Sequence, residues 1–477
     1  MERLTITLLA ILSLFQTPYS QQGIWLVDPL EAIYPDTNAF DGYKDKYSAA
    51  YPLGTPAAIH LVIKFPIGER VYLSAKINDT DCPVHYWSRL IDVPVEQNTG
   101  LDSRTEQFTN QLNPHVIRRA PFRIYEVIEP LEKPEFEIQQ NYQAFRFQIP
   151  ATHFNQAGKY RITLTVNRKS GKQTALFNAH YFECGLPELS ESEFFYTNWF
   201  NLTRMEEMHE LERWSDAWFA MLEQYAQLMA YGRQNSITLP GELLTWNGEK
   251  FTLDKAKMLQ FINVFRKHGF RYFESHHLMY RGDNDDWGSP ELKVRLTKNG
   301  YFSEAGKKDI NDLVHLIKEF TQENNLLNNW LQHIADEPTA ANAECYKEVV
   351  QQVKSIYPEI RIMEATNDRD GLTGAIDLWC PLINDFQENE PFFRDREKQN
   401  EKVLVYTCLI PGGKWLNRTL DMERLRQVYF GWGASRFNTS GYLHWGLNQY
   451  YAEPFLQSVI PHPSPAATSN NFLPAGD

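Results

Sequence analysis

The fold is decided by a stretch that runs Trp330-Leu331-Gln332-His333-Ile334-Ala335-Asp336-Glu337-Pro338, a short apolar run that ends in two adjacent carboxylates and a proline. Two neighbouring acids can divide their labour, because one can stay protonated as a proton donor while the other stays ionised and stabilises positive charge. The pair has a simpler interpretation as well. Asp336 would then be the N-cap of a helix, with Glu337 in its first turn.

The surrounding sequence favours a strand end over a helix cap. From Phe194 onward, short strand-like runs alternate with amphipathic stretches, a pattern typical of repeated βα units and a parallel sheet. Eight strands over this length predict a (β/α)8 barrel of the TIM type, with its active site at the C-terminal strand ends. The eight runs are 196–200, 236–239, 271–274, 330–333, 361–364, 377–380, 403–407 and 441–447.

Helical apolar spacing fills most of the intervals between these runs. The sixth helix, near 393–398, has a poor pattern, and the sequence ends at Pro474-Ala475-Gly476-Asp477 without an eighth helix. We therefore expect a barrel that lacks its last helix and is truncated at the C-terminus. The other helical stretches are 214–232, 253–268, 304–323, 340–357 and 422–437.

The region before the barrel has a different pattern. Short β-branched and aromatic runs between Ala57 and Glu183 are separated by turn residues such as Pro66, Gly68 and Gly171, which predicts an antiparallel β-sandwich. The expected division is a signal peptide at 1–20, a β-sandwich domain at 21–185, a linker at 186–193 and the barrel at 194–477. The runs are 59–65, 70–77, 122–128, 144–149, 160–166 and 174–182.

The N-terminus has the pattern of a signal peptide. Met1-Glu2-Arg3 precedes an apolar segment from Leu4 to Phe15, which a small polar stretch follows. The apolar segment is too short to span a membrane comfortably, and no other long apolar segment follows, so no stable membrane span is expected. No cysteine lies near the expected cleavage point. We therefore expect export to the periplasm or the medium without a lipoprotein anchor.

Charge and cysteine usage exclude several classes of function. With 60 Asp and Glu against 47 Lys and Arg, the formal charge of −13 argues against a nucleic-acid partner. The five scattered cysteines form neither a disulfide framework nor a CxxC metal site. The run Asp283-Asn284-Asp285-Asp286-Trp287-Gly288 places Trp287 where a calcium loop needs a ligand. We therefore expect no metal and no cofactor.

Polar and aromatic residues collect around the predicted strand ends, where a barrel places its site. Aromatic residues make up 14% of the chain, and sugar-binding clefts use flat rings to stack on pyranose faces. Trp415, beside Gly412 and Gly413, is the better candidate for such stacking. His333 is expected to be a supporting hydrogen-bonding residue. The remaining candidates are Asn201, Asn235, Glu274, His276, Asn367, Tyr406, Trp445 and Asn448.

Four segments together resemble glycoside hydrolase family 123. They are His333-Ile334-Ala335-Asp336-Glu337-Pro338, Trp415-Leu416-Asn417-Arg418, Gly441-Tyr442-Leu443-His444-Trp445 and Pro474-Ala475-Gly476-Asp477. The resemblance covers essentially the whole mature chain and implies a β-sandwich followed by a (β/α)8 domain. It also implies an exo-acting β-N-acetylgalactosaminidase, with Asp336 and Glu337 as the acid pair after strand four. Members of that family continue into a final loop and helix.

The resemblance implies a retaining mechanism in which the 2-acetamido oxygen of the substrate is the nucleophile, an exception to the two-carboxylate scheme. Asp336 would orient the acetamido N–H and stabilise the oxazoline-like intermediate, and Glu337 would be the acid and base. Two further roles rest on position and on analogy with other acetamido-assisted barrels. Tyr406 would donate its hydroxyl to the acetamido carbonyl, and Trp445 would form a wall of the N-acetyl pocket. Glu274, together with His276 and His277, could bind sugar hydroxyls or have a structural role.

Two alternatives remain at this stage. One is a non-catalytic glycan-binding protein on the same fold, motivated by the absent final helix. The other keeps the enzyme but changes the sugar, to β-N-acetylglucosamine or an unsubstituted hexose. The expected partner is a glycan or glycolipid with a terminal N-acetylhexosamine.

Overall fold

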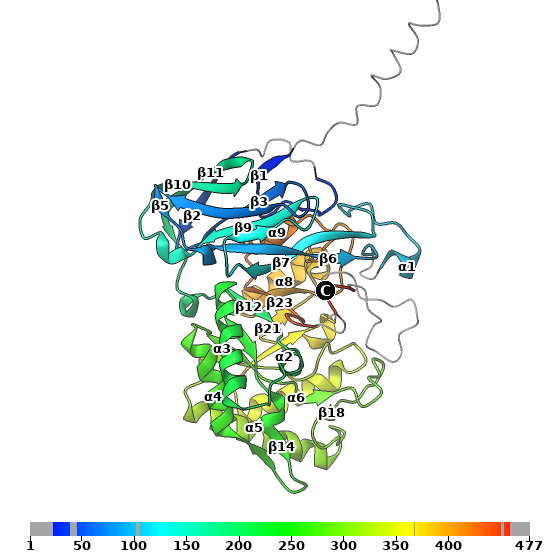
Figure 1. Ribbon diagram of the computed structural model, residues 1–477. Helices are drawn as coiled ribbons and strands as arrows, with labels where there is room; N and C mark the ends of the chain where they lie inside the picture. Colours follow the sequence, from blue (N-terminus) through cyan, green and yellow to red (C-terminus); the bar gives the residue numbers. More distant parts are fainter. Residues whose placement is uncertain (1–21, 39–44, 102–104, 367, 450–452, 458–477) are drawn as a thin grey trace, which may run out of the picture. The chain divides into compact units, whose positions relative to one another are not determined.

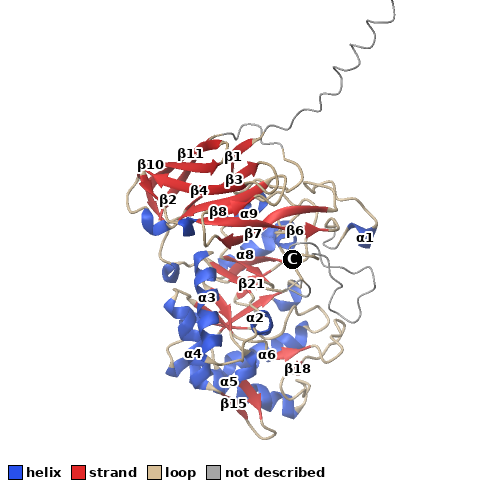
Figure 2. Ribbon diagram, in the orientation of Figure 1, coloured by secondary structure: helices blue, strands red, loops and turns tan. Residues whose placement is uncertain are grey.

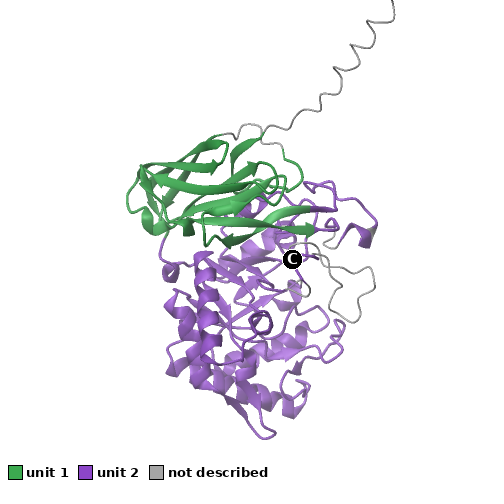
Figure 3. Cartoon of the chain, in the orientation of Figure 1, with its two compact units in different colours: residues 1–94, 123–186 green, residues 95–122, 187–477 purple. Residues whose placement is uncertain are grey.

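The computed structural model describes residues 22–38, 45–101, 105–366, 368–449 and 453–457. The chain forms two compact units, coloured green and purple in Figure 3. One contains residues 1–94 and 123–186, and the other contains residues 95–122 and 187–477. The sequence assigned 95–122 to the sandwich domain, whereas this segment groups with the second unit. The expected signal peptide lies outside the described residues, as does the end of the chain from 458 onward.

Two facing β-sheets form the first unit, which confirms the predicted sandwich. One sheet has the order β1-β3-β9-β6-β7, and the other has the order β2-β11-β10-β4-β5 with β8 paired to β4. Apolar side chains from both sheets meet in one core. The strands are β1 (Gly23–Val27), β2 (Lys46–Leu53), β3 (Ala57–Lys64), β4 (Arg70–Ile77), β5 (Thr80–Asp81), β6 (Trp87–Val95), β7 (Phe122–Pro130), β8 (Glu135–Glu137), β9 (Gln143–Ile149), β10 (Gly158–Arg168) and β11 (Gly171–Gly185).

Alternation along the strands explains this core. On β10, Ile162, Leu164 and Val166 are buried while their neighbours are not, because successive side chains point to opposite faces of a sheet. The hairpin to β11 closes at Gly171, whose φ of 134° is rarely adopted by other residues. One detail departs from the antiparallel prediction, since β2 pairs with β11 in parallel.

The second unit contains eight parallel strands in the order β12-β23-β22-β21-β20-β19-β16-β13. The two end strands also approach each other, because the Asn235 N–H donates to the Tyr196 carbonyl at 3.1 Å. The predicted barrel of eight strands is therefore confirmed, and each strand falls within a predicted run or within two residues of it. They are β12 (Phe195–Asn198), β13 (Ser236–Thr238), β16 (Tyr272–Glu274), β19 (Trp330–Gln332), β20 (Arg361–Ala365), β21 (Leu378–Cys380), β22 (Lys402–Thr407) and β23 (Gly441–His444).

Helices cover the outside of these strands, as Figures 1 and 2 show for α3, α4, α5 and α6. Side-chain caps start several of them: the Ser215, Asp254 and Ser303 side chains accept backbone N–H bonds at the first turns of α3, α4 and α5. The helices of this unit are α1 (Glu106–Thr109), α2 (Leu202–His209), α3 (Asp216–Tyr231), α4 (Lys255–Lys267), α5 (Glu304–Glu323), α6 (Ala343–Ile356), α7 (Ile383–Glu388), α8 (Glu390–Lys398) and α9 (Leu425–Phe437).

The connections between strands are uneven. Small hairpins follow two of the barrel strands: β14 (Leu244–Trp246) with β15 (Phe251–Leu253), and β17 (Met279–Tyr280) with β18 (Lys293–Val294). Only a short 3-10 turn at Asp370–Leu372 links β20 to β21. No helix follows β23 within 445–449 and 453–457. Among the helices that the structure describes, none is long and apolar enough to cross a membrane.

A buried carboxylate ties the segment 95–122 to the barrel loops. Asp421 has no exposed surface, and it accepts hydrogen bonds from the Thr99 N–H at 2.8 Å and from the Asn98 side-chain amide at 3.1 Å. The Ile117 N–H in turn donates to the Asp421 carbonyl at 2.9 Å. Because buried polar groups need partners, these bonds fix the segment to the loop before α9.

A glycine where two barrel strands meet allows a specific stability test. A Cβ added to Gly441 would lie 2.3 Å from the Phe195 carbonyl oxygen on β12, so Gly441→Ala must push the two strands apart. Overpacking of this kind costs about 1–3 kcal/mol, and thermal unfolding should show it as a lower Tm. Gly431→Ala is the matched control, because that position in α9 has open space around it. A Gly441→Ala protein as stable as the control would contradict this account.

Candidate active site

A cleft of about 1300 Å³ opens at the C-terminal ends of the barrel strands. Side chains that follow six of the eight strands line it, as expected for a barrel of this kind. They include Trp199 after β12, Leu239 after β13, His276 and His277 after β16, Asp336 and Glu337 after β19, Tyr406 and Cys408 from β22 and the residue after it, and Trp445 after β23. The predicted residues Asp336, Glu337, Tyr406, Trp445 and His276 therefore meet in one cleft.

Glu337 occupies a half-buried position in the loop after β19. Its backbone φ is +43°, a left-handed conformation that turns the chain sharply after the strand. The Tyr406 hydroxyl donates a hydrogen bond to Glu337 Oε1 at 2.5 Å. Burial, and after it the negative charge of Asp336, raise the pKa of Glu337 above its usual value despite this bond. Glu337 is therefore protonated more easily than an ordinary glutamate.

Asp336 has a more open environment. Its side chain is 47% exposed, and its Oδ1 lies 3.8 Å from His277 Nε2. The cationic Arg295, which also lines the cleft, interacts electrostatically with it. The two carboxylates thus occupy unlike environments, the condition under which neighbouring acids take separate roles.

Arg281 holds the backbone that carries both acids. Its Nη1 donates to the Asp336 carbonyl at 2.6 Å and to the Glu337 carbonyl at 3.2 Å. The guanidinium also lies over the ring of Trp287, 3.9 Å from the ring centre, which limits its movement. A charged donor shared by two consecutive carbonyls helps stabilise the strained conformation of Glu337.

Behind the cleft lies a buried ionic cluster of Glu274, His333 and Glu364. His333 Nδ1 is 3.1 Å from Glu364 Oε1, and its Nε2 is 3.4 Å from Glu274 Oε2. Burial alone would lower the pKa of His333, but the hydrogen bonds to the two carboxylates raise it to about 10. Burial alone would likewise raise the pKa of Glu364, but the bonds from His277 and His333 lower it to about 2. His333 is therefore an imidazolium between two carboxylates at neutral pH.

Glu274 connects this cluster to the wall of the cleft. The Trp199 indole N–H donates to Glu274 Oε2 at 3.0 Å, and the Ser236 hydroxyl donates to Oε1 at 2.7 Å. Burial would raise the pKa of Glu274, yet the bonds from His333 and Ser236 hold it below the usual value. Glu274 and His333 do not line the cleft. The position of Glu274 favours its structural alternative over a sugar contact, and the supporting role expected of His333 fits its position.

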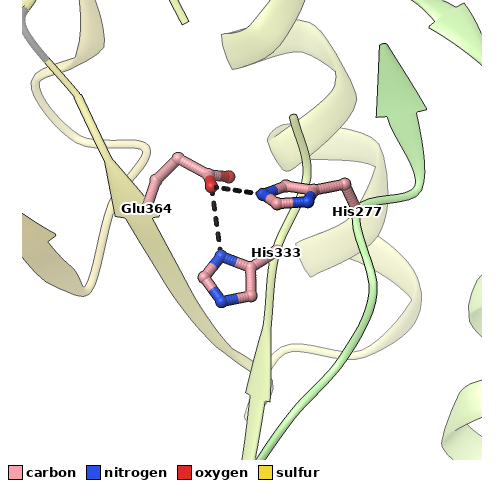
Figure 4. Close-up of side chains that lie close together, drawn as sticks. All are labelled: His277, His333 and Glu364. Carbon is pink, nitrogen blue, oxygen red and sulfur yellow. Dashed lines mark hydrogen bonds and ion pairs between the residues drawn. The ribbon is translucent and has the colours of Figure 1, made fainter. Parts of the chain in front are cut away.

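Three of these side chains have the donor types of a metal site. In the part of the chain that the structure describes, His277, His333 and Glu364 bring their ligand atoms within 4.8 Å of one another (Figure 4). A metal would need a neutral His333, because coordination requires a free lone pair. Two carboxylates hold the proton on His333 instead, and Glu364 already accepts several hydrogen bonds. The donor set fits an ionic hydrogen-bonded cluster better than a metal site.

His276 lines the cleft in the neutral form. Burial, followed by the neighbouring His277, lowers the pKa of His276 to about 4. Gly241 is required beside it, since a Cβ there would come within 2.7 Å of the imidazole ring. A neutral imidazole offers one donor and one acceptor, which suits a sugar hydroxyl.

Three predicted residues lie elsewhere and correct the sequence analysis. Asn235 precedes β13, at the opposite end of the strand from the cleft, where its side chain bonds the Tyr196 N–H at 2.9 Å and the Phe194 carbonyl at 2.9 Å. Asn448 bonds the backbone N–H and carbonyl of Asn201, and so joins the loops after β23 and β12. Trp415 is half-buried and does not line the cleft. Asn367 lies outside the described residues.

Sequence reasoning missed Trp199, Arg281 and Glu364. Trp199 directly follows the observed β12 but lies inside the predicted run 196–200, so the rule that selected residues past a strand end did not select it. Glu364 is an acid inside the apolar run Arg361-Ile362-Met363-Glu364-Ala365, and a charge in a buried strand is itself a signal of a special role. Arg281 had no signal, because its partners are backbone carbonyls of a distant loop.

Comparisons with known proteins agree with this geometry. A sequence model described as "Glycoside hydrolase 123, catalytic domain" matches residues 199–467. A solved family 123 glycoside hydrolase from Clostridium perfringens, studied for glycolipid glycan hydrolysis, superposes with a TM-score of 0.69 over 96% of this chain and 85% of that chain. Their sequences are 11% identical, so this likeness shows a shared fold.

Other solved structures are much less similar. Bacteroides uniformis beta-glucuronidase 3 has a TM-score of 0.29 at 9% identity, over 89% of this chain and 48% of its own. A GH10 xylanase from Thermobacillus composti has a TM-score of 0.33 at 13% identity, over 54% of this chain and 86% of its own. Scores this low support no further conclusion. No curated protein matches this sequence.

The ionic cluster makes stability depend on pH in a defined direction. A raised pKa in the folded state means that the charged His333 stabilises the fold fully below its usual pKa of 6.5 and loses that effect as pH rises towards 10. We expect the free energy of unfolding, measured in urea, to fall between these pH values. His333→Gln should be less stable by about 3–5 kcal/mol near pH 6, because two buried carboxylates lose their counter-charge.

The same variant should also lose part of the pH dependence. His315→Gln, which changes an exposed histidine on α5, is the control and should keep the slope of the native protein. Equal slopes for all three proteins between pH 6.5 and 10 would show that His333 is not the titrating group.

Proposed function

This chain belongs to glycoside hydrolase family 123 and is a glycosidase, and we propose that it removes terminal β-linked N-acetylgalactosamine with retention of configuration. One observation supports the chemistry most directly: Asp336 and Glu337 are adjacent at the strand-four end in unlike surroundings. The Asp336 side chain is 47% exposed, whereas Glu337 is hydrogen-bonded to Tyr406 and has a pKa raised by partial burial and by the charge of Asp336. That difference lets one acid stay ionised while the other carries a proton. The non-catalytic binding protein is set aside, since the family is one of glycosidases.

In the proposed reaction the nucleophile belongs to the substrate. The 2-acetamido oxygen attacks the anomeric carbon while Glu337 gives its proton to the glycosidic oxygen, so the glycosidic bond breaks and the aglycone leaves. Asp336 accepts a hydrogen bond from the acetamido N–H and offsets the positive charge of the oxazolinium. Glu337, now ionised, takes a proton from water as the water attacks the anomeric carbon. This attack opens the oxazolinium ring and restores the 2-acetamido group.

Tyr406 and Trp445 complete the proposed N-acetyl pocket. The Tyr406 hydroxyl donates to ionised Glu337, and a protonated Glu337 needs that bond less. The hydroxyl is then free to bind the acetamido oxygen. Trp445, which lines the same cleft, would pack against the acetamido methyl group.

The substrate class and location are part of this proposal. A cleft of about 1300 Å³ is large enough for a terminal sugar and part of its aglycone. The family relative from Clostridium perfringens is described as acting on glycolipid glycans, which supports a glycan or glycolipid substrate here. We also propose export, on the signal-like sequence at 1–20.

Loss of either acid should abolish most activity. Glu337→Gln removes the proton donor and Asp336→Asn removes the stabilising charge, and each should lower kcat on a nitrophenyl β-N-acetylgalactosaminide by about 10²- to 10⁴-fold. Absorbance of the released nitrophenol measures this. Glu344→Gln, an exposed acid in the first turn of α6, is the matched control and should keep full activity.

The choice of sugar tests the rest of the proposal. The corresponding β-galactoside lacks the 2-acetamido nucleophile and should be inert. Hydrolysis of that galactoside, or full activity of Glu337→Gln, would overturn the mechanism. Faster release from the β-N-acetylglucosaminide would keep the mechanism and change the substrate.

Tyr406→Phe should shift the pH profile. The Tyr406 hydrogen bond favours ionised Glu337 and so lowers its pKa; removing the hydroxyl lets that pKa rise. Because Glu337 must be protonated to act as the acid, the alkaline limb of kcat/KM should move to higher pH. Tyr442→Phe is the control, since that hydroxyl pairs with Thr407 outside the cleft. An unmoved or lowered limb in Tyr406→Phe would contradict the assignment.

A further inference from the structure

Glu364 is a fully buried carboxylate that contacts the backbone just before the acid pair. It lies on β20, and its Oε2 accepts hydrogen bonds from the Ile334 N–H at 2.9 Å and the Ala335 N–H at 3.1 Å. The Tyr346 hydroxyl on α6 donates to the same oxygen at 3.1 Å. Since Ala335 immediately precedes Asp336, this carboxylate fixes the point at which the strand becomes the catalytic loop.

The other oxygen of Glu364 is connected to Asp336 through a side chain, that of His277. Its Oε1 lies 3.1 Å from His333 Nδ1 and 3.3 Å from His277 Nε2, as the dashed lines in Figure 4 show. His277 Nε2 is also 3.8 Å from Asp336 Oδ1. The imidazole of His277 therefore stands between a buried carboxylate and the exposed one that faces the cleft.

Only an ionised carboxylate can satisfy this arrangement. The hydrogen-bond partners of the two Glu364 oxygens are two backbone N–H groups, the Tyr346 hydroxyl and the His333 imidazole. His277 Nε2 adds an ion-pair contact to Oε1 at 3.3 Å. A carboxylate offers about four acceptor sites, whereas a glutamine side chain would present an NH₂ group to one set of these donors. The proton on His333, held between Glu364 and Glu274, supplies the balancing positive charge. The negative charge of Glu364 and the hydrogen bonds that it accepts therefore depend on each other.

Asp336 is the acid that this arrangement serves. Glu337 has its own partner in Tyr406. Glu364 contacts the Ile334 and Ala335 N–H groups and His277. Ala335 directly precedes Asp336 and His277 lies beside its carboxylate, so both sets of contacts connect Glu364 to Asp336. Glu364 does not line the cleft, so it cannot contact substrate itself.

We infer that Glu364 is a positioning residue for Asp336, which it holds through the Ile334–Ala335 backbone and through His277. This inference rests on the proposed function, in which Asp336 stabilises the acetamido-derived intermediate. It adds a residue that touches neither substrate nor the reacting atoms. A misplacement of about 1 Å at a reacting group can lower a rate by about 10²-fold, which is enough to make such a residue measurable.

The experiment compares leaving groups. The substrates are aryl β-N-acetylgalactosaminides with leaving groups from dinitrophenol to phenol, and the readout is kcat/KM, which reports bond cleavage. A defect that acts through Asp336 slows acetamido assistance for every substrate, whereas a defect in the acid Glu337 grows as the leaving group becomes poorer. We expect Glu364→Gln to lose about 10²-fold, mainly in kcat, evenly across the series and in parallel with Asp336→Asn.

Two further variants keep the test independent of folding. His277→Gln breaks the side-chain route at a partly exposed residue and should show the same even loss, smaller in size. Asp421→Asn is the matched control, because it neutralises an equally buried carboxylate that accepts a bond from a backbone N–H, and neither Asp421 nor its partner Thr99 lines the cleft. It should lower Tm while kcat stays unchanged.

Each outcome decides the question. If Glu364→Gln and His277→Gln are folded and fully active, or if their losses grow with poorer leaving groups, the inference is wrong. If a chelator abolishes wild-type activity and Zn²⁺ restores it, the three side chains of Figure 4 are metal ligands and the inference is also wrong. If the wild-type protein hydrolyses none of the aryl β-N-acetylgalactosaminides, the proposed function is wrong, and this result is distinct from a failure of the inference about Glu364.

Discussion

The proton on His333 is the constraint on which the site depends. It lies between Glu274 on β16 and Glu364 on β20, so one imidazolium, from the residue after β19, links three neighbouring barrel strands through buried charges. Carboxylates so deeply buried would be unstable without this counter-charge. With it, they become strong acceptors that order Trp199 on one side and the backbone before Asp336 on the other.

This buried cluster explains how two adjacent acids can differ. Asp336 and Glu337 are neighbours in sequence, yet the turn at Glu337 sends one side chain towards Tyr406 and leaves the other beside His277. The loop itself is held by Glu364, which accepts a bond from the Ile334 N–H, and by Arg281, which donates to the Asp336 carbonyl. Rigid support of this kind suits a group that must stabilise charge without moving.

Much of the fold followed from sequence patterns. All eight barrel strands were predicted, because short apolar runs alternate with helices of period 3.6, and this pattern needs no tertiary information. In the sandwich, β1, β2, β5, β6 and β8 were missed. β2 has no β-branched residue and contains Pro52, and β6 contains Arg89, Asp92 and Pro94, so neither shows the usual pattern of a half-buried strand. The acid pair, Tyr406, Trp445 and His276 were found because residues just past parallel strands share one rim.

The barrel, the position of Asp336 and Glu337 at its fourth strand end, and the resemblance to a glycosidase family could all be inferred from the order of the residues. The three-dimensional arrangement was needed to separate the polar residues that support the cleft from those that lie away from it. Glu274 and His333 turned out to be buried, and Asn235 lies at the far end of its strand. The role of a buried carboxylate depends on the groups that it contacts. Those of Glu364 lie on α6 and in the loops after β16 and β19, so they are distant in sequence and no local pattern indicates them.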